Sequence, residues 1–140
     1  VADVAVREML MAEKDIKKAT VLILGITFKK DCSDIRNSKV VDLIERLKMY
    51  HIEPMISDAY ANSDDVQETY GIPLVPFDDL PLADCIIVAV GHHAYKSITI
   101  DKLLGMFKKE LPNAKKVLID INGIYNKDDL DASGIHFWQL

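Results

Sequence analysis

Cysteine is scarce in this chain of 140 residues, which contains only Cys32 and Cys85. Two cysteines so far apart provide neither a disulfide framework nor the ligand spacing of a metal site. No apolar run approaches the roughly 20 residues that span a membrane, and no charged-then-apolar leader opens the chain. We therefore expect a protein of the reducing cytoplasm, with no membrane partner. Because the chain starts with Val1 and enters directly into a helical pattern, we also expect it to be a fragment of a longer polypeptide.

An excess of positive charge is also missing. The net charge is −5 and the isoelectric point is near 5.3, which disfavours a nucleic-acid partner, because binding to a phosphate backbone needs a clustered basic surface. Apolar residues make up 49% of the chain and charged residues 28%, a balance typical of one globular domain with a hydrophobic core. The basic residues of the 29–39 loop form a local patch on this acidic protein, which suits a small anionic ligand.

Glycines are missing where a dinucleotide-binding fold needs them. That fold carries G-x-G-x-x-G directly after its first strand, so that a helix N-terminus can approach the pyrophosphate. Here the apolar run 21–24 ends at Gly25, and the next eleven residues contain no second glycine. The sequence therefore predicts no self-sufficient NAD site in this chain.

Apolar runs that alternate with amphipathic segments predict the fold. The fold class is α/β, with a Rossmann-like, doubly wound, mostly parallel sheet of about six strands. We expect strands at 20–24, 53–57, 72–75, 84–90, 116–120 and 135–138, and helices at 3–18, 38–50, 63–70, 78–82, 100–111 and 127–132. Pro73 places the third of these strands at an edge. The first helix has a thin apolar stripe, so we expect it to lean on something outside the chain.

The loop after the first strand holds the strongest functional candidates. Lys29, Lys30 and Arg36 lie between the strand and the start of a helix, where free backbone N–H groups and cationic side chains favour an anion. An alternative is a solvated loop whose charges pair with its own aspartates. Phe28 favours the ligand-binding alternative, because an aromatic residue beside a cation is unusual in a loop that is merely solvated.

Neither cysteine has the surroundings of a nucleophile. Cations near Cys32 could lower its pKa, but its loop offers no base to activate it. Cys32 is therefore expected to be structural, and Cys85 is expected in the core because it lies in an apolar strand.

Polar residues also border the other strands, and we expect structural roles for them. Asp58 ends the second strand, where a Rossmann fold places its ribose-binding acid, but without the glycines it is expected to cap a turn. His92 and His93 lack the spacing of a metal site; one of them is expected to cap backbone groups, with a catalytic role as the less favoured alternative. Asp84 and Asp120 border strands, with Asp120 facing the rim where the strands end.

Four segments carry a resemblance to a known family. LGITFKKDCSDIRNSKVVDLI (24–44) resembles the signature of the C-terminal domain of the UDP-glucose/GDP-mannose dehydrogenase family, which reads L-G-x-x-[FY]-K-x-[DN]-x-x-D-x-R-x-[ST]. The similarity continues through SDAYANSDDVQETYGI, ADCIIVAVGHHAYK and VLIDINGIYN. Within this signature, the segment CSDIRNSK is most similar to the sequences of the branch that oxidises UDP-N-acetylhexosamines.

The resemblance implies a division into residues 1–18, the end of an inter-domain connecting helix, and residues 19–140, the C-terminal domain. It implies a four-electron oxidation of the C6 alcohol of a UDP-sugar with two NAD⁺, in polysaccharide biosynthesis. NAD, the nucleophilic cysteine and the dimer contacts of a homodimer would belong to upstream NAD-binding and central domains, so no catalytic residue is expected in this chain.

By the same resemblance, Phe28 and Lys29 match contacts to the UDP-sugar, and Arg36 matches a residue that reaches the NAD diphosphate across the domain boundary. Asn122 stands where many members place Arg or Lys; its amide can hydrogen-bond a substrate but carries no charge. Ala59 replaces a proline, which loosens one turn. Two alternatives stay open: a stand-alone nucleotide-sugar or phosphate-binding module, and a structural assembly domain without catalysis.

Overall fold

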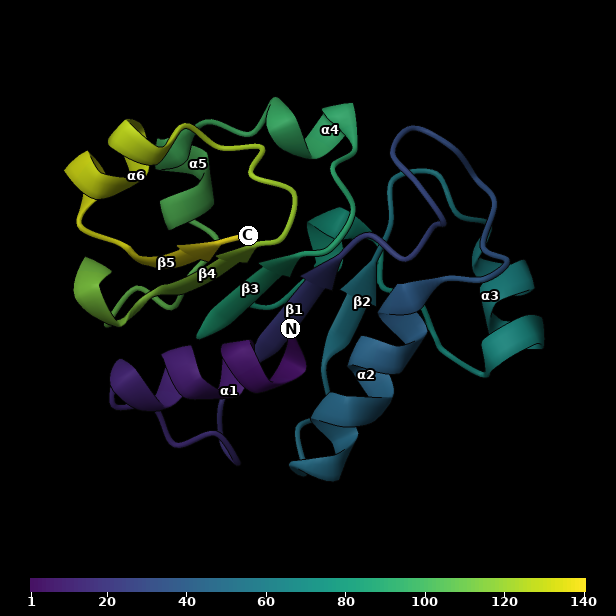
Figure 1. Ribbon diagram of the computed structural model, residues 1–140, viewed down its shortest axis with the longest axis horizontal. Helices are drawn as coiled ribbons and strands as arrows, with labels where there is room; N and C mark the ends of the chain where they lie inside the picture. Colours follow the sequence, from purple (N-terminus) through teal and green to yellow (C-terminus); the bar gives the residue numbers. More distant parts are fainter.

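A single parallel sheet runs through the middle of the molecule (Figure 1). The computed structural model describes residues 1–140. The strands are β2 (Met55–Ser57), β1 (Val21–Leu24), β3 (Cys85–Val88), β4 (Val117–Asp120) and β5 (His136–Gln139), in this spatial order. All four pairings are parallel. The predicted α/β, Rossmann-like sheet is confirmed, with five strands and no antiparallel pair.

The sixth predicted strand, residues 72–75, is not part of the sheet. It contributes one isolated parallel bridge, between Leu74 and Ile56 at the β2 edge. The Val75 N–H donates to the Ile56 carbonyl at 2.8 Å. Pro73 has no N–H to extend the pairing, which limits this segment to one bridge.

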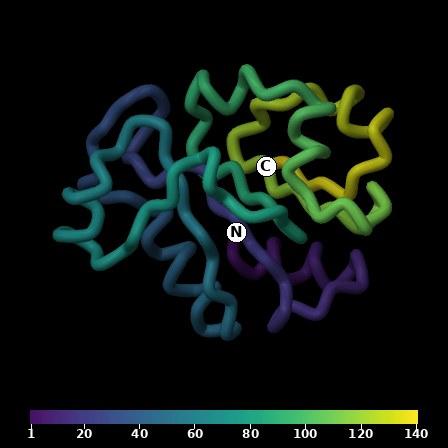
Figure 2. Tube along the Cα trace, turned by 180° about the vertical axis from the view of Figure 1, so that it is seen from behind, coloured from purple at the N-terminus to yellow at the C-terminus, as the bar shows by residue number.

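Helices cover both faces of the sheet (Figures 1 and 2). One face carries α1 (Ala2–Met11) and α2 (Lys39–Met49); the other carries α4 (His93–Lys96), α5 (Ile100–Leu104) and α6 (Lys127–Ser133). Helix α3 (Ser63–Tyr70) lies beyond β2, and the 3₁₀ turns Phe77–Asp79 and Asn113–Lys115 are in connections. None of the helices is long and apolar enough to cross a membrane.

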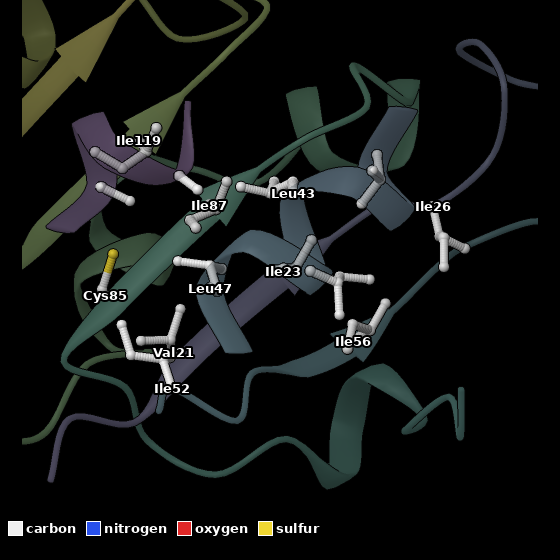
Figure 3. Close-up of a cluster of buried hydrophobic side chains, with 14 of the residues drawn as sticks. Val21, Ile23, Ile26, Leu43, Leu47, Ile52, Ile56, Cys85, Ile87 and Ile119 are labelled. Atoms are coloured by element: carbon white, nitrogen blue, oxygen red, sulfur yellow. The ribbon is translucent and has the colours of Figure 1, made fainter. Parts of the chain in front are cut away.

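The central strands are buried on both faces because helices cover both. In β1, Val21 and Ile23 pack into the core under α1 and α2, whereas Leu22 and Leu24 pack into the core on the opposite face. Figure 3 shows Val21 and Ile23 with Leu47 of α2 in the first of these cores. This two-sided burial explains why the strands read as continuous apolar runs.

Helix α1 packs against the domain's own sheet, so the expectation that it leans on something outside the chain is wrong. Its stripe joins the larger core through Ala5 and Met9, both fully buried. Two side-chain contacts reinforce the packing: Asp3 forms an ion pair with Arg46 of α2, and the Glu8 carboxylate lies within hydrogen-bond distance of the His136 ring of β5. The helix also ends earlier than predicted, at Met11 and not near residue 18.

We expect Met9→Ala to lower the free energy of unfolding by about 2–5 kcal/mol, because it empties a fully buried site in the core. Leu10→Ala is the matched control: Leu10 is the next residue of α1 but is 56% exposed, so its change should stay within about 0.5 kcal/mol. Urea unfolding of both variants measures the difference. Equal losses would contradict the docking of α1 on the sheet.

Two helices on the second face differ from the sequence prediction. Helix α5 ends at Leu104 and not near residue 111, because the following residues bind the chain that leads into β3. Ala83 donates its N–H to the Met106 carbonyl and accepts the Lys108 N–H, each at 2.9 Å. The four-residue helix α4 was not foreseen.

Side chains cap two of the predicted helices. The Ser38 hydroxyl accepts the Val40 N–H at the start of α2, and the Asn62 side chain accepts the Asp65 N–H at the start of α3. Gly71 ends α3 with a φ of 67°, which glycine adopts without strain. These local signals position α2, whose first turns border the functional site.

Candidate functional site

The C-terminal ends of β1 and β3 meet at the point where the strand order reverses. Ligands of open α/β sheets bind in the crevice at this place. At the base of this crevice Gly25 (φ 102°) presses against Val90, and a Cβ on Gly25 would lie 2.6 Å from the Val90 Cβ. Gly25 therefore provides a tight contact between two strand ends and not a cradle for a diphosphate.

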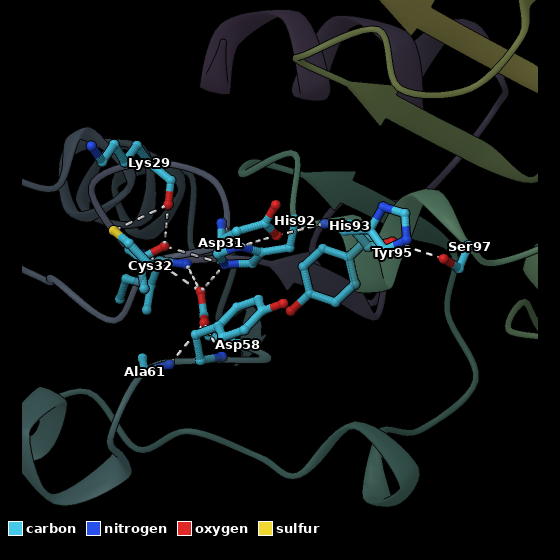
Figure 4. A network of polar contacts seen from close by, with 12 residues as sticks. Lys29, Asp31, Cys32, Asp58, Ala61, His92, His93, Tyr95 and Ser97 are labelled. Carbon is cyan, nitrogen blue, oxygen red and sulfur yellow. Dashed lines mark hydrogen bonds and ion pairs between the residues drawn. The ribbon is translucent and has the colours of Figure 1, made fainter.

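A buried carboxylate and imidazole fill the space beside this contact (Figure 4). The Asp58 side chain is fully buried and accepts N–H groups from Ile26 (2.7 Å) and Ala61 (2.9 Å), with further bonds to Thr27 and Tyr60. Burial alone would raise the pKa of Asp58, but these N–H donors and the His92 ring outweigh it, so the pKa is lowered. The predicted capping role of Asp58 is confirmed, and its oxygens are not available to a ribose.

His92 connects Asp58 to the loop after β1. Its ring is completely buried, with Nε2 at 3.1 Å from Asp58 Oδ2 and 3.2 Å from Thr27 Oγ1. Nδ1 accepts the Asp31 N–H at 2.8 Å, and the Asp31 carboxylate accepts the His93 N–H at 2.8 Å. The His92 ring binds a backbone N–H, as expected of one of the two histidines, whereas His93 takes part only through its own backbone N–H. The contact of the ring with the loop after β1 was not predicted from the sequence.

A large cleft lies above this network, at the ends of β1, β3 and β4. Its volume is about 1200 Å³. The lining residues come from the chain start (Val1, Ala2, Asp3), the loop after β1 (Thr27, Phe28, Lys29, Lys30), the α2 region (Asn37, Lys39, Val40, Asp42, Leu43, Arg46), the end of β3 (Ala89, Val90, Gly91), α4 (Lys96) and the end of β4 (Ile121, Asn122, Gly123, Ile124). Phe28, Lys29 and Asn122, three of the predicted site residues, therefore line one cleft.

Positive charge dominates the cleft. Its acidic residues are Asp3, which is paired with Arg46, and Asp42. The four lysines (Lys29, Lys30, Lys39 and Lys96) form no ion pair with any carboxylate. Unpaired lysines around a concave surface attract a phosphorylated ligand.

Sequence reasoning missed Arg46 and Lys96 of the cleft, and it included Lys39 only as one of the basic residues of the 29–39 loop. Lys39 and Arg46 lie seven residues apart on α2, a spacing that places both on one helix face. That periodicity was a signal that could have found them. Lys96 had no such signal, because its helix α4 was not predicted.

Arg36 lies apart from the large cleft. It lines a smaller cavity of about 260 Å³ with Phe28, Asp34 and Asn37, and Phe28 borders both cavities. Its guanidinium binds Asp34 through two parallel hydrogen bonds of 3.0 and 2.9 Å, which hold the pKa of Asp34 at about 2. The side chain is 83% exposed. The sequence places Arg36 in the same loop as Lys29 and Lys30, but in the structure it lines a different cavity from theirs.

Asn122 follows β4, and its amide donates to the Ala89 carbonyl at 3.1 Å. This bond joins the ends of β3 and β4 and leaves the side-chain oxygen without a protein partner. Asn122 can therefore hydrogen-bond a ligand in the cleft, but it adds no charge there.

The cysteines and the remaining aspartates have structural surroundings, as expected. Burial raises the pKa of the Cys85 thiol, which lies in the core of β3. The Cys32 thiol lies 3.5 Å from the Lys29 carbonyl, and no base contacts it. Asp84 binds Lys14, Lys108 and the Thr20 N–H. Asp120 is fully buried; its carboxylate accepts N–H groups from the turn after β4 and from Gln139.

The loop, the cleft and the sheet match one known family. The model of the UDP-glucose/GDP-mannose dehydrogenase family, UDP binding domain, matches residues 22–127. This chain belongs to that family. Its matched segment contains the loop after β1 and every lining residue of the cleft except those at the chain start.

Curated relatives agree with this assignment. The chain is 32% identical over 143 residues to protein CapL of Staphylococcus aureus, covering all of this chain and 31% of that protein. It is also 32% identical over 126 residues to the UDP-N-acetyl-D-glucosamine 6-dehydrogenase of Pseudomonas aeruginosa, covering 90% of this chain and 29% of that protein. The chain thus spans about a third of the length of these relatives and corresponds to one domain of them.

A solved structure agrees in fold. The NDP-N-acetyl-D-galactosaminuronic acid dehydrogenase of Methanosarcina mazei Go1 superposes with a TM-score of 0.81 over 99% of this chain and 28% of that chain, at 21% sequence identity. At this identity the similarity shows that the fold of the UDP binding domain is shared.

Proposed function

We propose that this chain is the C-terminal, UDP-binding domain of an NAD-dependent UDP-sugar 6-dehydrogenase. The intact protein would oxidise the C6 alcohol of a UDP-N-acetylhexosamine or UDP-glucose to the carboxylate, in polysaccharide biosynthesis. The observation that carries this proposal is the cleft lined by Phe28 and by lysines without a carboxylate partner, within the segment that matches the family. We further propose that the intact protein works as a homodimer in the cytoplasm.

Within the cleft, Phe28 and Lys29 are the proposed contacts to the UDP-sugar. Phe28 is 57% exposed and offers a flat apolar surface to a base or sugar ring. Lys29 offers a charge to the diphosphate. Asn122 is the proposed neutral contact on the opposite wall, through its free side-chain oxygen.

The switch point of this sheet lacks the glycine-rich turn that holds NAD in a dinucleotide-binding fold. Gly25 is in tight contact with Val90, and the carboxylate of Asp58 is saturated by backbone donors. NAD, held by a domain outside this chain, would accept the hydride. Arg36, exposed on the far side of Phe28, is the residue proposed to reach the diphosphate of that NAD across the domain boundary.

The proposal is tested by assaying NAD reduction with UDP-N-acetylglucosamine and UDP-glucose. The intact protein should turn over one of them, and residues 1–140 alone should be inactive, because neither cysteine of the chain is an activated nucleophile. UDP titrated against the isotope-labelled chain should shift amide resonances of the 27–37 loop. Turnover by the chain alone would overturn the proposed division of labour, and an inactive intact protein would overturn the proposed reaction.

Arg36→Ala in the intact protein should raise the KM for NAD about tenfold, the usual loss for one charge-assisted contact. The KM for the UDP-sugar should change less than about twofold, because Arg36 lies outside the large cleft. Arg36→Lys keeps the charge without the planar fork, so its KM for NAD should lie between those of the wild type and Arg36→Ala. Steady-state kinetics with each substrate varied in turn separates these effects; an increase only in the KM for the UDP-sugar would contradict the assignment.

A further inference from the structure

We propose that His92 is a positioning residue that holds the Phe28–Lys29 backbone in its substrate-binding geometry through Asp31. This inference rests on the proposed function, because the loop it positions is the one assigned to the UDP-sugar. It assigns a role to a completely buried side chain that does not itself reach the cleft.

The side chains of Phe28 and Lys29 do not fix their own positions. Phe28 is 57% exposed, and Lys29 is exposed and forms no ion pair. Where these side chains lie in the cleft therefore depends on the backbone of the loop.

Hydrogen bonds fix that backbone on both sides of Lys29. On one side, the Thr27 hydroxyl donates to the Lys29 carbonyl at 3.0 Å. On the other side, Asp31 has a φ of 56°, a left-handed conformation that a non-glycine residue keeps only when its surroundings stabilise it. The bond from the Asp31 N–H to the buried Nδ1 of His92 provides this stabilisation.

The hydrogen-bond pattern also assigns the tautomer of His92. Nδ1 accepts an N–H, so the ring proton of neutral His92 is on Nε2 and points to Asp58 Oδ2 and Thr27 Oγ1. Tyr60 and Tyr95 flank the ring, with centroids at 4.8 and 5.5 Å. One imidazole, held in one orientation, thereby connects the end of β2 to both sides of the Lys29 turn.

A second bond makes the connection reciprocal. The Asp31 carboxylate accepts the His93 N–H at 2.8 Å, so loop and α4 start are joined twice (Figure 4). The two bonds join residues that are about 60 positions apart in the sequence. These residues can meet only because β1 and β3 are neighbours in the sheet.

Two substitutions separate positioning from simple packing. His92→Asn retains an acceptor near the place of Nδ1 and so can keep the Asp31 bond, while His92→Gln retains a donor near the place of Nε2 and loses it. In residues 1–140 carrying His92→Gln, the Asp31 amide should exchange with solvent faster than in His92→Asn. In the intact enzyme, His92→Gln should raise the KM for the UDP-sugar about tenfold with kcat nearly unchanged, and His92→Asn should stay within about threefold of the wild type.

Each outcome decides the inference. Equal KM increases in both variants, together with equal losses of thermal stability, would show a packing role and overturn it; unchanged kinetics and exchange in His92→Gln would also overturn it. If the intact wild type oxidises no UDP-sugar, the proposed function fails, and the exchange comparison alone still decides whether His92 holds the loop.

A surface pair of variants covers the case in which the buried substitutions prevent folding. Asp31→Gly removes the carboxylate that accepts the His93 N–H, and glycine adopts the positive φ without strain. It should speed exchange of the His93 amide and raise the KM for the UDP-sugar about threefold. Asp31→Asn keeps an acceptor oxygen and should behave as the wild type; no difference between these two variants would overturn the part of the inference in which the Asp31 carboxylate joins the loop to the start of α4.

Discussion

Lys29→Ala in the intact protein is expected to raise the KM for the proposed UDP-sugar substrate by roughly 10- to 150-fold, because a lost charge-assisted hydrogen bond costs about 1.5–3 kcal/mol. Lys29 lines the cleft without a carboxylate partner, so its charge is available to a diphosphate. The KM for NAD should change little, since the proposed NAD contact lies in a separate cavity.

Lys109→Ala is the control for Lys29→Ala. It removes the same charge from an exposed lysine that does not line the cleft. A general effect of net charge on anionic substrates would appear in both variants, whereas a specific contact appears only in Lys29→Ala. Equal kinetics of Lys29→Ala and the wild type would contradict the assignment of the cleft to the UDP-sugar.

Gly25→Ala is expected to lower the free energy of unfolding by about 2–5 kcal/mol, from the strain of a positive φ and from overpacking. The new Cβ would lie 2.6 Å from the Val90 Cβ and 2.9 Å from its backbone nitrogen. A backbone atom cannot rotate away, so the ends of β1 and β3 would have to move apart. The Asp58–His92 network lies beside this contact, and the functional loop should loosen with it.

Gly71→Ala separates the two causes. Gly71 also has a positive φ, 67°, but a Cβ there would meet no atom within 4 Å. Gly71→Ala should therefore lower the free energy of unfolding only by the conformational strain, about 1 kcal/mol. Chemical denaturation of both variants gives the comparison, and a loss at Gly71 as large as at Gly25 would refute the steric contact with Val90.

Local patterns in the sequence were sufficient for most of the elements. Ser38 and Asn62 cap α2 and α3 through bonds to N–H groups no more than three residues further along the chain, and Gly71 ends α3. These helix boundaries therefore follow from interactions between neighbours in the sequence. The exceptions have long-range causes. Helix α5 stops early because Ala83, some twenty residues before, binds the residues that follow it.

The candidate site was only partly predictable. Phe28, Lys29 and Asn122 were named from the sequence and line one cleft, but Arg46 and Lys96 were not named. The sequence offered pairing of the loop's charges with its own aspartates as an alternative. It could not show that Arg36 pairs with Asp34 while Lys29 and Lys30 form no ion pair, because that depends on how the loop folds back.

By itself, the sequence determined the parallel sheet, the family signature after β1 and the absence of a glycine-rich NAD site, since each is a property of consecutive residues. Only the tertiary structure decided that α1 packs on its own sheet and that His92 holds the loop around Lys29. Both depend on which strands become neighbours. The order β2-β1-β3-β4-β5 places the ends of β1 and β3 side by side, and so brings Asp31 and His92 together.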